Sequence, residues 1–185
     1  MARILVTGTA GFIANHVAHK FLADGHDVVG VDNFNDYYPV ELKRHRHALL
    51  EGKKNYEGIR LDLASREKTE ELISKGNFDV VCHLAAQPGV RYSIENPHSY
   101  ISANLVAFLH VLEGCRHASN KPRLVYASSS SVYGGLKELP FSENQRVDTP
   151  ISLYAATKKC DELLAHTYSH LYDIQTVGLR FFTVY

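Results

Sequence analysis

Tyr154 and Lys158 are the two residues whose types and spacing point most directly to chemistry. They stand four residues apart in YAATK, inside a segment with helical periodicity. Four residues of helix rise about 6 Å and return to nearly the same face, so the phenol and the ammonium are expected to lie together. A free phenol has a pKa of about 10, but a nearby positive charge favours the phenolate. The pair is a candidate base for a hydroxyl proton, although most helical Tyr–Lys pairs only pack together.

Four consecutive serines, Ser128 to Ser131, follow the apolar segment RLVYA at 123–127. Serine-rich segments after a strand are usually loops, which is the first interpretation of this cluster. The second interpretation is that one hydroxyl faces the site, where it orients a substrate oxygen and passes a proton to a neighbouring base. The Tyr–Lys pair downstream favours the second interpretation for one serine. Ser128 is expected to serve the backbone at the strand end.

A glycine-rich turn, TGTAGFIAN at 7–15, lies between the first expected strand and the first expected helix. Gly8 and Gly11 let the backbone turn sharply and approach a pyrophosphate, while the helix N-terminus offers free N–H groups. Ala14 takes the place of the third glycine of the dinucleotide-binding pattern, where alanine is tolerated. This strand–turn–helix context predicts a dinucleotide site.

Asp32 ends the second expected strand, about 20 residues after the glycine turn, where dinucleotide-binding domains hold a ribose. A carboxylate there accepts both ribose hydroxyls and repels a 2′-phosphate, and no arginine follows closely, so NAD is favoured over NADP. The alternative is that Asp32 only starts a turn. Asp62 ends the third strand in a similar place, either near an adenine or as part of a helix N-cap. Asn104, on an apolar helix face, needs partners that are either backbone or cofactor.

The elements that must position these residues alternate along the chain. Strands are expected at 3–7, 27–32, 56–63, 79–86, 123–127 and 174–182, and helices at 12–22, 65–74, 96–115 and 149–173, with another after the insert at 33–40. Alternation of this kind implies parallel strands joined by right-handed crossovers. We therefore expect one domain over 1–185, a doubly wound parallel α/β sheet of the Rossmann type.

The composition argues against several other classes of protein. Twenty basic and twenty acidic side chains balance among 185 residues, so charge indicates neither nucleic acid nor a membrane as partner. No apolar run approaches a membrane span, and the N-terminus resembles a strand more than a signal peptide. Cys82, Cys115 and Cys160 are odd in number and far apart, which favours free thiols and a cytoplasmic location. The histidines form no HExxH motif, so no metal site is expected.

Taken in order, TGTAGFIA, Asp32, HLAA at 83–86, SSSSVYG and YAATK resemble the extended short-chain dehydrogenase/reductase family over the whole chain. Four motifs narrow the resemblance to bacterial UDP-glucuronate 4-epimerases: DNFNDYYPVELK at 32–43, AAQPGVRYSIENPHSYI at 85–101, YASSSSVYG at 126–134 and LRFFTVY at 179–185. The resemblance implies NAD-dependent epimerisation at carbon 4 of a nucleotide sugar, UDP-glucuronate to UDP-galacturonate, through a transient 4-keto sugar. Alternatives within the family are a UDP-glucose/galactose 4-epimerase, a dehydratase and a decarboxylase.

The same resemblance implies roles for individual residues. Tyr154 would be the base, Lys158 would bind the nicotinamide ribose, and Ser129 would be the catalytic serine. The residues implied to bind NAD are Gly8, Gly11, Phe12, Ile13, Asp32, Asn33, Asp62, Leu63, Leu84, Ala85, Ala86, Asn104, Tyr154 and Lys158. The residues implied to meet the UDP-sugar are Ser129, Ser130, Tyr154 and Thr183.

Ser130 and Ser131 distinguish this chain from two groups of relatives. Sugar-nucleotide dehydratases carry an Asp–Glu pair at these positions, and UDP-glucuronate decarboxylases typically carry Glu at the second. Because both positions are serine here, elimination and decarboxylation lack their usual acid/base group.

The sequence ends at RFFTVY, where members of the family continue into a domain that forms most of the sugar pocket. We therefore expect the chain to be the cofactor-binding part, with its C-terminal substrate domain mostly absent and no turnover alone. An interpretation of a different class is a nucleotide-binding or interaction module without catalysis. In relatives the helices at 97–118 and 154–172 build a homodimer, and the same pairing is expected here.

Overall fold

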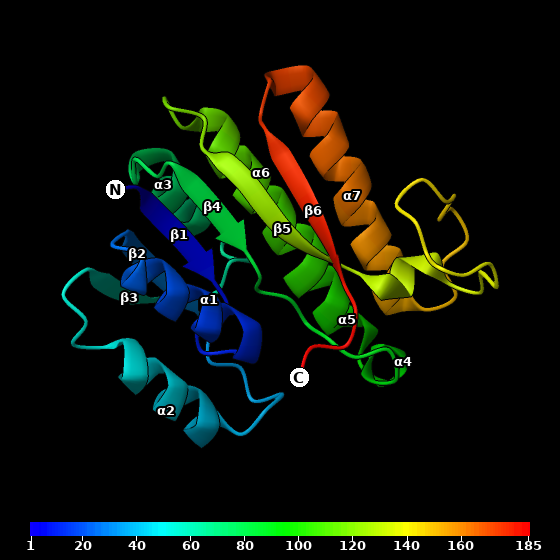
Figure 1. Cartoon of the computed structure of the whole chain (residues 1–185), viewed down its shortest axis with the longest axis horizontal. Coiled ribbons are helices and arrows are strands. Elements are labelled where there is room, and N and C mark those ends of the chain that lie inside the picture. Colours follow the sequence, from blue (N-terminus) through cyan, green and yellow to red (C-terminus); the bar gives the residue numbers. More distant parts are fainter.

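A six-stranded parallel sheet forms the centre of the protein, and the computed structural model describes all residues from 1 to 185 (Figure 1). The strands lie in the order β3-β2-β1-β4-β5-β6. Their bounds are β1 (Arg3–Thr7), β2 (Asp27–Asp32), β3 (Tyr56–Arg60), β4 (Val80–His83), β5 (Arg123–Ser129) and β6 (Thr176–Phe181). All neighbouring pairs are parallel. This order confirms the doubly wound Rossmann-type sheet, and its switch point lies between β1 and β4, where such sheets bind ligands.

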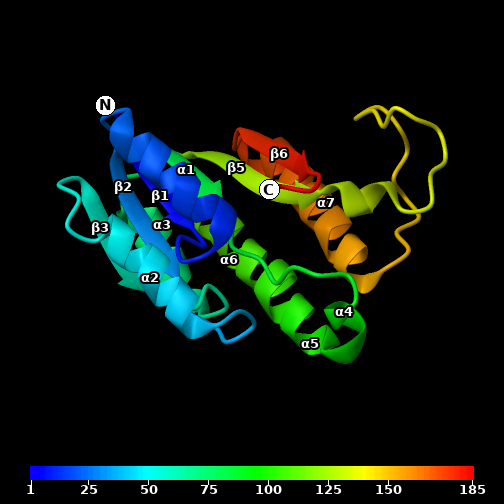
Figure 2. The ribbon, with the colours of Figure 1, turned by 60° about the horizontal axis from the view of Figure 1, so that its bottom comes forward.

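Helices cover the two faces of this sheet (Figure 2). On one face lie α1 (Phe12–Ala23) and α2 (Val40–Leu50), and on the other lie α3 (Arg66–Lys75), α6 (Ala107–His117) and α7 (Leu153–Tyr172). None of the helices combines the length and apolarity that a membrane crossing requires.

The strand β1 shows why the sheet is buried on both sides. Leu5 belongs to the larger core with Val111 of α6, whereas Ile4 and Val6 belong to the smaller core with Ala18 of α1. Successive side chains of a strand point to opposite faces, so an unbroken apolar run supplies both cores. The continuous apolar runs in the sequence are therefore a property of central parallel strands.

The helix expected at 96–115 is continuous but not uniform. It consists of α5 (Pro97–Tyr100), a π-helical segment η1 (Ile101–Val106) and α6. Two short helices were not expected from the sequence: α4 (Tyr92–Glu95) and the 3₁₀ helix η2 (Ser130–Tyr133). π-Helical turns inside helices are frequent at functional sites, and η1 contains Asn104.

The long helix expected within 149–173 runs from Leu153 to Tyr172. Ser152 is its N-cap, because the Oγ atom of Ser152 accepts a hydrogen bond from the backbone N–H of Ala155 at 3.1 Å. This cap fixes the start of α7 and places Tyr154 in its first turn.

Candidate active site

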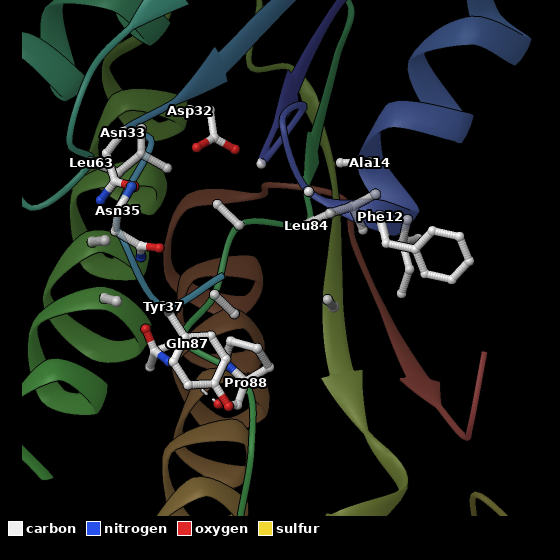
Figure 3. Close-up of a pocket in the computed structure, with 18 of the residues that line it drawn as sticks. Phe12, Ala14, Asp32, Asn33, Asn35, Tyr37, Leu63, Leu84, Gln87 and Pro88 are labelled. Carbon is white, nitrogen blue, oxygen red and sulfur yellow. Dashed lines mark hydrogen bonds between the residues drawn. The ribbon is translucent and has the colours of Figure 1, made fainter. Parts of the chain in front are cut away.

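Most of the expected site residues surround one cavity of about 390 Å³ at the carboxyl ends of the strands (Figure 3). The expected residues that line it are Gly8, Gly11, Phe12, Ile13, Asp32, Asn33, Asp62, Leu63, Leu84, Ala85, Ala86, Ser129, Tyr154 and Lys158. Asn104, Ser130 and Thr183 are not among its lining residues. The cavity therefore collects residues from both sides of the switch point.

The glycine turn needs its two glycines for steric reasons. Gly8 has a φ of +82°, and a Cβ atom there would lie 3.0 Å from the Cα atom of Ala85. A Cβ atom at Gly11 would lie 2.9 Å from the carbonyl oxygen of Gly8, which accepts the Gly11 N–H at 2.8 Å. No side chain caps the start of α1, so its N–H groups remain free for an anion.

Asp32 faces this cavity from the end of β2 (Figure 3). Its Oδ2 atom accepts from the backbone N–H of Ala10 at 3.1 Å, and its Oδ1 atom accepts from that of Phe34 at 2.8 Å. The carboxylate thus ties the glycine turn to the loop after β2 and keeps lone pairs available. Next to it, Asn33 donates to the Oδ2 atom of Asp62 at 3.3 Å.

The segment after β4 is held by Thr7. Its hydroxyl accepts from the backbone N–H groups of Leu84 and Ala85 at 3.1 and 3.0 Å, and it lies 2.9 Å from Nδ1 of His83. Burial, with a smaller contribution from Lys158, lowers the pKa of His83 to about 3, so the ring is neutral. Because the Thr7 oxygen already accepts two bonds, its proton is donated to Nδ1 and the ring carries its proton on Nε2.

Ser129, Tyr154 and Lys158 reach the cavity from β5 and α7. The Oγ atom of Ser129 accepts the backbone N–H of Ser131 at 3.1 Å, which leaves its own proton free to donate. The Tyr154 ring packs edge-on against Tyr100, with centroids 6.1 Å apart. The Nζ atom of Lys158 donates to Asp161 at 3.0 Å. A hydroxyl donor, a phenol and an ammonium therefore line the same cavity.

The amide of Asn104, for which either backbone or cofactor partners were expected, bonds to the backbone. Its side chain is 1% exposed; it accepts from the Gln87 N–H at 2.8 Å and donates to the Gln87 carbonyl at 3.2 Å and to Thr157 at 3.0 Å. Asn104 therefore fixes the loop that follows β4 and ties it to α7, while Gln87 lines the cavity.

The expectation for Ser128 was wrong. Its hydroxyl donates to a carboxylate, the Oε1 atom of Glu162 on α7, at 2.7 Å. The same carboxylate accepts from both Nε and Nη2 of Arg180 on β6 at 2.8 and 2.9 Å. This network, which we call the Glu162 network, joins β5, β6 and α7 beside Ser129.

Several further lining residues were missed, chiefly Asn35, Tyr37, Lys43, Gln87 and Pro88. Lys43 is 6% exposed and its ammonium donates to Asn35, while burial lowers its pKa. Tyr37 lies beside Gln87 and Pro88 (Figure 3) and its ring packs on Tyr92 with centroids 4.9 Å apart. All of these belong to the two long motifs at 32–43 and 85–101, which was the available signal.

A doubly wound sheet with a glycine turn, an aspartate at the end of β2 and a Ser–Tyr–Lys set in one cavity defines a dinucleotide-binding domain with catalytic potential. The chain belongs to the NAD dependent epimerase/dehydratase family, whose model matches residues 4–185.

The similar proteins include several sugar-nucleotide epimerases. Over 183 residues the chain is 53% identical to Protein CapI of Staphylococcus aureus, covering 99% of this chain and 54% of that protein. It is 52% identical to UDP-glucuronate 4-epimerase 2 of Arabidopsis thaliana, covering 98% and 42%. The crystal structure of UDP-glucuronic acid 4-epimerase from Bacillus cereus with UDP-glucuronic acid and NAD superposes with a TM-score of 0.90 at 37% identity, covering 99% and 57%. The chain thus spans about half the length of its relatives.

Proposed function

We propose that this chain is the cofactor-binding part of an NAD-dependent nucleotide-sugar 4-epimerase that interconverts UDP-glucuronate and UDP-galacturonate. The observation that carries the proposal is that Ser129, Tyr154 and Lys158 share one cavity with the glycine turn and Asp32. Oxidation of an alcohol removes a proton and a hydride together, so it needs a base beside a nicotinamide site. The Arabidopsis and Bacillus cereus relatives support UDP-glucuronate as substrate and carbon 4 as the position.

The residues present fit NAD. Cβ atoms at Gly8 and Gly11 would crowd the backbone of Ala85 and Gly8, so the turn beside the cavity needs glycine, and the free N–H groups of α1 suit a pyrophosphate. Asp32 is proposed to hold the adenosine ribose, and Asn33, Asp62 and Leu63 to flank the adenine. The remaining proposed contacts come from Phe12, Ile13, Leu84, Ala85, Ala86, Tyr154 and Lys158. When bound, NAD supplies the acceptor and donor of hydride for the sugar carbon.

Tyr154 is proposed to take the proton of the sugar 4-hydroxyl when carbon 4 gives up its hydride. It returns a proton to the same oxygen when a hydride is added to the opposite face of carbon 4. Ser129 orients the reacting oxygen, because its hydroxyl proton is not used within the protein. Lys158 favours the phenolate of Tyr154 by its positive charge. Ser130 and Thr183 are proposed to meet the sugar where it extends past the cavity, since each follows a lining residue directly.

An uncovered sheet face supports the idea that a further segment completes the enzyme. On the face opposite α7, β5 and β6 carry no helix (Figure 1), and Val177 and Leu179 are 54% and 38% exposed there. Doubly wound parallel sheets are normally covered on both faces. We propose that residues beyond this domain cover the strip and form most of the sugar pocket.

A homodimer is proposed through the segments 97–118 and 154–172. Exposed apolar side chains lie on both, including Ile101 and Leu109 on the first and Leu163 and Leu171 on the second. A second copy would bury these side chains. Light scattering of the full-length enzyme is expected to give the mass of two chains, and a monomeric mass would contradict this pairing.

The activity is tested with the full-length enzyme and UDP-glucuronate, with proton NMR to follow the sugar. UDP-galacturonate is the expected product. Tyr154→Phe keeps the ring against Tyr100 and is expected to lower kcat by about 10²- to 10⁴-fold. Tyr172→Phe on the same helix is the matched control, with turnover unchanged. Absence of UDP-galacturonate, or full activity of Tyr154→Phe, would sink the proposal.

Calorimetry separates the enzyme from a non-catalytic module. The 185-residue chain alone is expected to bind NAD weakly or not at all and not to epimerise, because the uncovered strip at Val177 and Leu179 is left open. The full-length enzyme is expected to show saturable NAD binding, whereas an interaction module would show none. Measurable turnover by the 185-residue chain would refute the expectation that further residues are needed.

A further inference from the structure

One buried carboxylate that the proposed mechanism does not use touches the proposed catalytic lysine. The Nζ atom of Lys158 donates to the Oδ2 atom of Asp161 at 3.0 Å, and both side chains are only 2% exposed. Lys158 lines the cavity and Asp161 does not. The carboxylate therefore holds the ammonium from behind, on the side away from the cavity.

The Asp161 carboxylate has no hydrogen-bond partner other than Lys158. Its Oδ1 atom is buried without a hydrogen bond, and burial raises the pKa of its carboxyl to about 6 although Lys158 acts to lower it. The next residue, Glu162, behaves differently. Burial acts to raise the Glu162 pKa, but the bonds from Arg180 and Ser128 outweigh it, and the pKa is lowered. Two adjacent carboxylates thus serve different partners, and Asp161 serves Lys158.

We propose that Asp161 is a positioning residue for Lys158, which fixes the ammonium and offsets part of its positive charge at Tyr154. The proposal rests on the proposed function, in which Tyr154 is the base. A negative charge bound behind the ammonium weakens the positive potential at the phenol, so ionised Asp161 opposes deprotonation of Tyr154. It also holds the lysine in one place, because a buried ammonium without a partner is unfavourable.

The other ionisable groups around this pair do not replace Asp161. His83 on β4 is kept neutral, as burial lowers its pKa. Burial, and secondarily Glu162 and Asp161, raise the pKa of Tyr126 on β5, so Tyr126 is also neutral. Glu162 is occupied by Arg180 of β6. Asp161 is the only acceptor of the Lys158 ammonium, so its charge is the one that most directly offsets the charge of Lys158.

The test is a spectroscopic titration of Tyr154 in the full-length enzyme loaded with NAD. Tyrosinate absorbance is recorded from acid to alkaline pH for each variant, and the spectrum of the same variant with Tyr154→Phe is subtracted. This readout needs no substrate and no turnover. Asp161→Asn keeps an oxygen that accepts from Nζ but removes the charge. It is expected to move the Tyr154 midpoint down by about one pH unit, and the acid limb of kcat/KM with it.

Glu162→Gln is the matched control, because it removes the neighbouring charge of a carboxylate that serves Arg180. Its expected shift is less than half that of Asp161→Asn. Asp161→Ser, which also accepts a hydrogen bond without charge, replaces the amide variant if the latter does not fold, with the same shift expected. An unchanged Tyr154 midpoint, or an equal shift in Glu162→Gln, would overturn the role of Asp161. Absence of any Tyr154 titration in the unmodified enzyme would overturn the proposed function and this role together.

Discussion

Replacing Gly8 with alanine should destabilise the glycine turn for two separable reasons. Gly8 has a φ of +82°, a conformation that costs an L-residue about 1–2 kcal/mol. The added Cβ would also lie 3.0 Å from the Cα atom and 3.1 Å from the N atom of Ala85. Because this neighbour is backbone, relief requires a shift of the segment after β4, and overpacking of this kind costs about 1–3 kcal/mol.

Gly25 offers a matched control in the same chain. Its φ is +83°, yet nothing lies within 4 Å of a Cβ atom built there. Gly25→Ala should therefore lose only the conformational part, about 1–2 kcal/mol. The difference between the two variants isolates the close approach of the turn to Ala85, and we expect Gly8→Ala to lose about 1–3 kcal/mol more.

The free energies of unfolding of both variants can be measured by urea titration of the 185-residue chain. NAD content is then measured in the full-length enzyme, where Gly8→Ala is expected to lose the cofactor and Gly25→Ala to keep it. Equal losses of stability in the two variants would refute the steric argument. Normal NAD retention by Gly8→Ala would refute the assignment of this turn to the pyrophosphate.

Three other predictions concern buried and half-buried polar groups. Burial lowers the His83 pKa from 6.5 to about 3. The free energy of unfolding should therefore be at its full value above pH 6.5 and should fall by about 3 kcal/mol between pH 7 and pH 4. His83→Asn should flatten that loss in urea titrations. Asn104→Leu should cost about 2–4 kcal/mol by urea titration, because it leaves Gln87 and other buried partners unpaired; an unaffected unfolding midpoint would contradict this. In a double-mutant cycle, Glu162→Gln and Arg180→Met should couple by about 1.5–3 kcal/mol, whereas strictly additive losses would argue against their ion pair.

Much of the fold was predictable because its signals are local. The bounds of β1 and β2 match the expected segments, since an apolar run ended by a glycine turn or by Asp32 needs no distant information. The bounds of α7 were less predictable, because the helix could begin at any of several residues before Tyr154. The capping bond between Ser152 and Ala155 decides that start.

The site residues were predictable where residue type and local spacing define the role. They were not predictable where the role depends on hydrogen-bond partners far away in the sequence. Gly8 and Asp32 follow from types and spacing on adjacent segments. Asn104 depends on Gln87 and Thr157, which lie 17 and 53 residues away, so only the folded chain shows that its amide serves the loop after β4. Lys43 stands at the start of a locally basic stretch, a pattern typical of a solvated helix face, and its burial against Asn35 comes from the path of the β2–α2 insert.

Side chains other than Ser129 and Tyr154 contribute to the relative position of these two residues. Ser129 ends β5 and Tyr154 lies in the first turn of α7, and the connection between them contains no long element. In addition to their shared apolar core, the two elements are joined by the Glu162 network, in which Glu162 on α7 binds Ser128, the residue before Ser129. One residue earlier on the same helix, Asp161 holds Lys158. Two neighbouring carboxylates on α7 thus have different roles. Glu162 ties the helix to β5 and β6 of the sheet, and Asp161 holds the ammonium of Lys158.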